Sequence, residues 1–228
     1  MLRLRWSCAG AVALGLMVPR LAHAQLLADS VSDFSLTQGL DGWSYGYYQG
    51  TFVPDSFQDL PYTMYWPTNG WAWTYAQTHG AGSWTGIWND GQHPDGANTG
   101  PVQWAVRRWT SDYSGLVTIS GQIGKEPYAG GSNGVFGYIF VGDDDVWTQF
   151  VPGDDWAPIQ YEFTAEVVPG ETIDFAVGPN GADYNDSTKF TAVISAGKSS
   201  PTPGPAAGAC MLIGLAGALR RRPTHSNR

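Results

Sequence analysis

Tryptophans are the residues of this sequence best suited to hold a ligand. Trp84 and Trp88 stand among glycine, serine, threonine and asparagine, which predicts an exposed loop. Trp71 and Trp73 alternate, and alternate residues of a strand point to one face. Indole rings stack on the C–H faces of sugars while neighbouring polar groups bind the hydroxyls. The sequence predicts glycan stacking at Trp84 and Trp88, with Trp71 and Trp73 second; the alternative is that these rings only pack the core.

Clustered acids indicate a second kind of site, for a cation. Asp183 and Asp186 bring carboxylate oxygens to a turn, and hard cations such as calcium prefer oxygen ligands. Asp33 would complete this site if the first and last strands pair. The run from Asp143 to Asp145 is a further candidate, and neither segment has the EF-hand spacing. We expect a structural calcium ion at Asp33, Asp183 and Asp186; the alternative is a solvated loop, because Asp favours turns.

The sequence gives little support for a catalytic site. His79 and His93 have no nucleophile elbow or His-Glu-x-x-His motif beside them. Glycoside hydrolysis needs two carboxyls across a cleft, whereas Glu162 and Glu166 share the polar face of one predicted strand. We therefore predict that the protein is not an enzyme, and keep a secreted polysaccharide hydrolase as a third alternative.

Short strands separated by turns must position these residues. Runs rich in branched and aromatic residues predict strands over residues 116–120, 135–141, 146–151, 159–168, 172–177 and 189–194. Within residues 161–167 apolar and polar positions alternate, so one face is buried and the other is wet. The earlier part is less regular and more aromatic. The pattern predicts an all-β fold, a two-sheet antiparallel β-sandwich of jelly-roll type.

Charge and cysteine content narrow the function classes. Residues 25–200 hold all 20 acidic residues of the chain and five basic ones, a formal charge of −15. Without a basic face, nucleic acid is a poor partner. Cys8 and Cys210 lie outside this stretch, so the domain has no disulfide or cysteine-bound zinc. We expect residues 25–197 to form one domain, since no internal linker divides them.

The first 24 residues have the three parts of a secretory signal. Arg3 and Arg5 precede an apolar run over residues 9–18, and Ala22 and Ala24 supply the small residues that a signal peptidase reads. About ten apolar residues are too few to cross ~30 Å of hydrocarbon. We expect residues 1–24 to be a signal peptide, against the alternative of a buried N-terminal helix.

The other end predicts a linker and a membrane segment. Residues 198–205 are polar and proline-rich, which excludes regular helix. Residues 206–219 carry no charge and precede the cluster Arg220, Arg221 and Arg222, the polarity of a cytoplasmic end. About fourteen residues give ~21 Å of helix, short for a permanent transmembrane helix. We expect residues 206–228 to be a sorting segment with a short hydrophobic helix; a simple membrane anchor is the alternative.

The tail resembles the PEP-CTERM sorting signals of Gram-negative bacteria. The resemblance rests on Pro201 and Pro203, the apolar segment and the arginine cluster, with Thr202 in place of the family's usual Glu. It implies recognition and cleavage by a membrane-bound, exosortase-like sorting protease. The resulting location would be the cell surface or the extracellular matrix.

The domain itself resembles galactose-binding-like and carbohydrate-binding-module sandwiches of exported bacterial proteins. The stretches that carry this resemblance include residues 42–47, 105–109 and 170–177. It implies a fold and carries over no binding residue. We predict a non-catalytic, exported surface or matrix protein that binds a polysaccharide or another glycan; the alternative is a structural matrix component without a small ligand.

Overall fold

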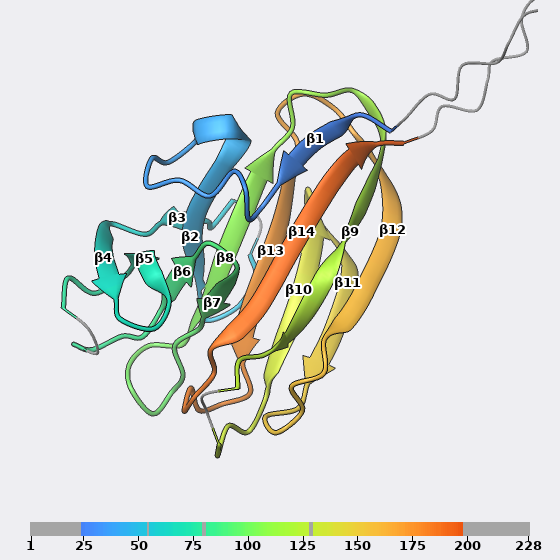
Figure 1. Cartoon of the computed structure of the whole chain (residues 1–228). Coiled ribbons are helices and arrows are strands. Elements are labelled where there is room, and N and C mark those ends of the chain that lie inside the picture. Colours follow the sequence, from blue (N-terminus) through green and yellow to red (C-terminus); the bar gives the residue numbers. More distant parts are fainter. Residues whose placement is uncertain (1–23, 54, 79–80, 128–129, 198–228) are drawn as a thin grey trace, which may run out of the picture. The chain divides into compact units, whose positions relative to one another are not determined.

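β-strands form nearly all of the regular structure in this computed structural model. It describes residues 24–53, 55–78, 81–127 and 130–197, all within one unit. Besides a short 3-10 helix, η1 (Leu40–Gly42), these residues form the strands of Figure 1: β1 (Leu26–Asp29), β2 (Trp43–Gln49), β3 (Gln58–Asp59), β4 (Tyr62–Trp66), β5 (Gly70–Thr74), β6 (Gly86–Trp88), β7 (Gly91–His93), β8 (Gln103–Thr110), β9 (Gly115–Lys125), β10 (Val135–Val141), β11 (Asp144–Val151), β12 (Ile159–Val167), β13 (Thr172–Pro179) and β14 (Thr188–Ala196).

The predicted terminal segments lie outside the described residues. These are the signal peptide before Ala24, the proline-rich linker, and the sorting segment with Pro201, Pro203 and the arginine cluster. Their assignments stay predictions. Among the residues that the structure does describe, no helix has the length and apolarity needed to cross a membrane.

Two antiparallel sheets face each other. The described strands of the first sheet run in the order β12-β9-β14-β7-β6-β5-β4, and β1 pairs with β14 as well. The second sheet runs in the order β11-β10-β13-β8-β2-β3. Figure 1 shows the long strands of the two sheets layered against each other, with β4 to β7 extending to one side. The predicted all-β, two-sheet antiparallel sandwich is confirmed.

Apolar side chains from both sheets fill the space between them. Phe175 of β13 and Phe190 of β14 meet edge to face with ring centroids 5.8 Å apart. Ile119, Ile139 and Ile194 are fully buried in the same cluster. Along β12 the burial alternates as the sequence predicts, and each of the six predicted strands lies on an observed one.

Strands β6 and β7 are too short and too fully buried to be positioned by an alternation of buried and exposed side chains. Each has only three residues, and all six residues are buried. Gln92 of β7 donates from Nε2 to the carbonyls of Ala105 and Phe175, at 3.1 and 3.0 Å, in the opposite sheet. This side chain satisfies buried carbonyls while joining the two sheets.

Arg107 of β8 makes the second connection. Its side chain is 1 % exposed and its guanidinium donates to the carbonyls of Ser30 (2.7 Å), Trp88 (2.6 Å), Asn89 (3.0 Å) and Gly91 (3.5 Å). Burial lowers the pKa of Arg107 to about 10, so the group is still charged at neutral pH. A planar group with five donors can serve these four carbonyls at once, and three of them lie around the β6–β7 turn. Arg107 therefore holds the β6–β7 turn against β8.

Replacing Arg107 tests this connection. Arg107→Met should lower the free energy of unfolding by about 3–5 kcal/mol, because the carbonyls are left buried without donors. Lys189→Met is the matched control: it removes an exposed 3.1 Å ion pair with Asp90 and should cost ~1 kcal/mol or less. Urea denaturation measures both. Equal losses in the two variants would contradict the role of Arg107.

Candidate functional site

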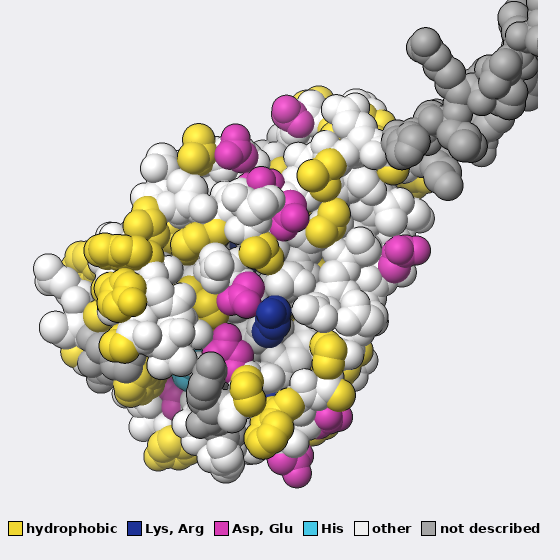
Figure 2. Space-filling model, in the orientation of Figure 1, with side chains coloured by type: hydrophobic (Ala, Val, Ile, Leu, Met, Phe, Trp, Pro, Cys, Tyr) yellow, Lys and Arg dark blue, Asp and Glu magenta, His cyan; other side chains and the backbone are white. Residues whose placement is uncertain are grey.

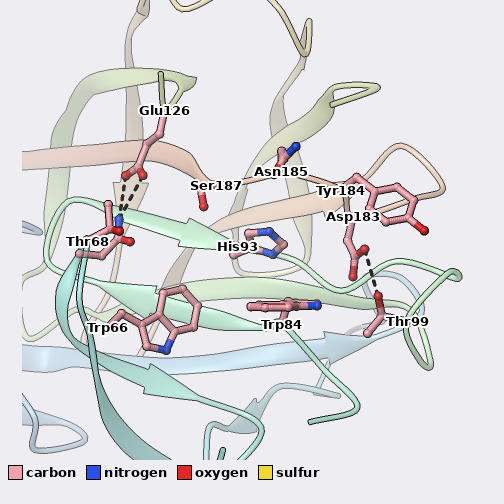
Figure 3. A pocket seen from close by; sticks show the side chains of 11 residues that line it. Trp66, Thr68, Trp84, His93, Thr99, Glu126, Asp183, Tyr184, Asn185 and Ser187 are labelled. Atoms are coloured by element: carbon pink, nitrogen blue, oxygen red, sulfur yellow. Dashed lines mark hydrogen bonds between the residues drawn. The ribbon is translucent and has the colours of Figure 1, made fainter. Parts of the chain in front are cut away.

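A cavity of about 350 Å³ lies where five loops meet at the ends of strands. The loops follow β4, precede β6, follow β7, follow β9 and precede β14. Figure 3 shows their side chains converging on it. The described residues that line the cavity are four with rings, two acids and five neutral polar residues: Trp66, Trp84, His93 and Tyr184; Glu126 and Asp183; Thr68, Asn69, Thr99, Asn185 and Ser187.

Two indole rings form one wall. In Figure 3 the rings of Trp66 and Trp84 lie beside each other, with His93 over Trp84. The Trp84 ring is half-buried and lies 6.3 Å from the His93 ring, and the backbone N–H of Trp84 donates to Asp95 Oδ1 at 3.1 Å. Trp66 is 6 % exposed and packs on Trp88, with ring centroids 5.4 Å apart. Both rings are thus fixed by packing before a ligand arrives.

Glu126 provides one acid of the cavity. It follows β9, and its carboxylate accepts hydrogen bonds from Asn69 Nδ2 at 3.0 Å and from Trp88 Nε1 at 3.1 Å. Burial raises the pKa of Glu126, and these two donors oppose that effect. Glu126 therefore links β9 to the β4–β5 turn and to β6.

Asp183 provides the other acid. It accepts from the backbone N–H of Gly96 (3.1 Å), from Asn98 Nδ2 and from Thr99 Oγ1 (3.1 Å). Burial acts to raise the pKa of Asp183, but these donors and the neighbouring Asp95 carboxyl hold it below its ordinary value. A Cβ on Gly96 would lie 2.5 Å from the Asp183 backbone nitrogen, so this close approach requires glycine.

Asp95 lies beneath the cavity, fully buried. Its Oδ1 accepts from Trp84, while Oδ2 is buried and accepts no hydrogen bond from the described residues. Burial raises the pKa of Asp95 to about 7, and the nearby Asp183 carboxylate raises it as well. A proton on Oδ2 would satisfy that atom and point toward Asp183. Below about pH 7 the two acids therefore act as one protonated and one ionised partner.

The loop before β14 is fixed from below by a buried ion pair. Lys125 Nζ lies 3.4 Å from Asp186 Oδ1 and donates to the Asn185 carbonyl at 2.9 Å, and Ser132 Oγ donates to Asp186 Oδ1 at 2.6 Å. Burial lowers the pKa of Lys125 to about 8 despite the acid partner. Asn185 adopts φ of 58°, a left-handed conformation that Asn tolerates.

The four predicted tryptophans have different positions. Trp84 lines the cavity. Trp88 is 1 % exposed and Trp73 is 8 % exposed, which corrects the expectation that they lie on an open face. Trp73 stacks on Tyr45 in the core, and Trp88 packs under the cavity wall. Trp71 is 54 % exposed but is not among the residues that line the cavity.

The three predicted calcium ligands are not brought together. The first and last strands do pair, but Asp33 hydrogen-bonds to the Asp29 N–H, and Asp29 is opposite Val193 near the far end of β14. Asp183 and Asp186 both precede β14, where they take separate partners. The described residues contain no group of three His, Cys, Asp or Glu that could hold a metal ion. Asp33 is therefore not part of a site with Asp183 and Asp186, which corrects that expectation. Calcium binding itself stays a prediction.

Several cavity residues were not predicted as site residues. Trp66, His93, Glu126 and Tyr184 come from four separate segments. In the sequence the turn that holds Tyr184 stands out only for its acids, and His93 has no catalytic motif beside it. Glu126 lies beyond the strand predicted over residues 116–120 and carries no sequence signal of its own.

Comparisons with known proteins find only remote likenesses. No protein-family model matches the chain, and no curated protein matches it. Among solved structures, the CBM51 module of Clostridium perfringens GH95, solved with methyl-galactose, is 13% identical over 47% of this chain and 81% of that one, with a TM-score of 0.32. A family 35 carbohydrate binding module from Clostridium thermocellum is 11% identical over 66% of this chain and 97% of that one, at 0.27. Pika GITRL is 15% identical over 50% of this chain and 98% of that one, with a TM-score of 0.29. Likenesses this remote carry no argument about a ligand.

The acid pair makes stability depend on pH. Between about pH 4 and pH 7 folded Asp95 keeps a proton that it loses on unfolding, so the contribution of Asp95 to stability falls as the pH rises through this window. Asp95→Asn places an N–H donor where the proton would be. At pH 8 it should raise the free energy of unfolding by ~1 kcal/mol or more, roughly 2–4 °C in Tm, with no gain near pH 4.

Thermal melts at both pH values measure this effect. Asp112→Asn, at an exposed position, is the control and should leave both melting temperatures nearly unchanged. A lower Tm for Asp95→Asn at pH 8 would show that Asp95 is needed as a carboxylate.

Proposed function

We propose that this protein is a non-catalytic glycan-binding module of an exported surface or matrix protein. The observation that supports the proposal is the cavity with the Trp66 and Trp84 rings on one wall and hydrogen-bonding side chains around them. Ligand cavities commonly have volumes of about 300–1,000 Å³, and this one lies at the lower end. The site suits one or two sugar rings at a chain end or branch.

The chemistry of the lining matches the two sides of a sugar. The C–H faces need flat apolar surface, which the Trp84 ring supplies, and the hydroxyls need donors and acceptors, such as Thr99, Asn185 and Ser187. Those groups lie on loops held by buried contacts. A pre-formed site of this kind avoids most of the ordering cost of binding.

Hydrolysis is the second candidate function. Glu126 and Asp183 both line the cavity, and burial raises the pKa of Glu126 as a general acid requires. Against it, both oxygens of Asp183 already accept hydrogen bonds, Oδ2 from Gly96 and Oδ1 from Asn98 and Thr99. These donors and the neighbouring Asp95 carboxyl hold the pKa of Asp183 below its ordinary value, which makes Asp183 a weak general base, so binding is favoured.

A role as a structural matrix protein is the remaining alternative, in which the rings only support the fold. A glycan panel separates it from binding. We expect saturable, sugar-competable binding of at least one oligosaccharide by isothermal titration calorimetry, without release of reducing ends. Trp84→Ala should weaken that binding about tenfold or more, because it removes the stacking surface.

Trp71→Ala is the matched control, since Trp71 is exposed outside the cavity. It should leave the affinity unchanged, and circular dichroism should show both variants folded. Absence of binding across the panel would favour the structural role, and release of reducing ends that Glu126→Gln abolishes would favour hydrolysis.

Export and sorting are part of the same proposal. The signal-like residues 1–24 and the tail with its arginine cluster support it. Protein recovered from the surface of an expressing Gram-negative cell should begin near Gln25 by N-terminal sequencing. Mass spectrometry should show loss of the segment after the proline-rich linker where a sorting protease is present. An uncleaved N-terminus at Met1 would contradict export by this route.

A further inference from the structure

The fixed charges that line the cavity are all negative among the described residues. Glu126 and Asp183 are its acids, and no Lys or Arg is among those lining residues. In Figure 3 the two acids lie on opposite sides, with His93 between them. A ligand that enters the cavity meets carboxylates without a cation to offset them.

The adjacent lysine does not neutralise this charge. Lys125 precedes Glu126, but its ammonium is fully buried, where it pairs with Asp186 and donates to the Asn185 carbonyl. That pair is neutral as a unit. Glu126 is only partly buried and receives hydrogen bonds from neutral donors, Asn69 and Trp88. Its negative charge is therefore available to a ligand.

The aromatic side chains favour the same kind of ligand. The faces of Trp66 and Trp84 carry negative electrostatic potential and attract a cation within about 6 Å of the ring, tryptophan most strongly. Tyr184 is 63 % exposed at the rim and adds a third ring. Rings beside a carboxylate are the usual chemistry for holding an ammonium group.

The net charge of the whole domain also favours a cationic ligand. Residues 25–200 carry a formal charge of −15, and acidic side chains outnumber basic ones on the face drawn in Figure 2. Such a field repels polymers of uronic acids and attracts polycations, which raises their local concentration and association rate.

We infer that the cavity binds a glycan that carries a protonated amine, of the glucosamine type, with the ammonium paired to Glu126 and a sugar ring stacked on Trp84. Asp183 contributes its charge from the other side of the cavity. The inference rests on the proposed glycan binding and narrows the class of ligand. Neutral and N-acetylated sugars lack the cation, and acidic sugars meet like charge.

Four trisaccharides of similar size test it by calorimetry at pH 6.5: a glucosamine trimer, its N-acetylated form, a cellotriose and a triuronate. We expect the glucosamine trimer to bind at least tenfold more tightly than any of the other three trisaccharides. Its affinity should fall in 0.5 M NaCl, because salt screens the attraction between ammonium and carboxylate. Equal or tighter binding of any other trimer overturns the inference while leaving glycan binding intact. No binding by any of the four overturns the inference, and a wider panel that also shows none overturns the proposed function.

Two controls separate a built site from general charge attraction. Trilysine carries the same charge without a sugar ring, and equal binding of trilysine would overturn the inference. Glu126→Gln should reduce the preference for the amine over the N-acetyl form about tenfold, whereas Glu166→Gln, at an exposed position on β12, should not change it. An unchanged preference in Glu126→Gln, with the fold intact by circular dichroism, would also overturn it.

Discussion

The buried guanidinium of Arg107 is the interaction on which the site depends. It satisfies four carbonyls, three of them around the β6–β7 turn, without a carboxylate partner within ion-pair distance among the described residues. Desolvating a charge costs several kcal/mol, and the hydrogen bonds that the two terminal guanidinium nitrogens donate to carbonyl dipoles offset that cost. The strands on either side of the turn carry Trp84 and His93 to the cavity. Moving the turn would therefore move the cavity wall.

A chain of buried polar groups continues from this turn to the site. Gln92 spans the sheets, and Gln103 accepts from Ser83 and Thr85, the residues on both sides of Trp84. Asp95 then holds the Trp84 backbone. Each of these side chains makes at least one directed bond, while Gln92 Oε1, Gln103 Nε2 and Asp95 Oδ2 have no hydrogen-bond partner among the described residues. Directed bonds thus position the segments around Trp84, whereas the long strands β9, β10, β13 and β14 pack through apolar side chains.

This difference explains what the sequence could predict. In β12 the alternation of apolar and polar residues is a local signal, and the strand and its buried face were predicted correctly. Trp84 and Trp88 have similar neighbours in sequence, yet one lines the cavity and the other is buried beneath it. Trp88 bonds to Glu126, 38 residues away, and no pattern within a strand-length window contains that contact. Asp183 and Asp186 are likewise close in sequence but face different partners.

The same contacts determine how rigid the cavity is before binding. The loop before β14 is held at Asp183 by the β7–β8 loop and at Asp186 by Lys125, both through buried carboxyls. Between these fixed points Tyr184 is exposed, so its ring can change rotamer while the backbone stays in place. The tryptophan wall is fixed by packing as well. Binding would therefore order little more than one tyrosine, and selectivity would come from the charges and ring faces already in position.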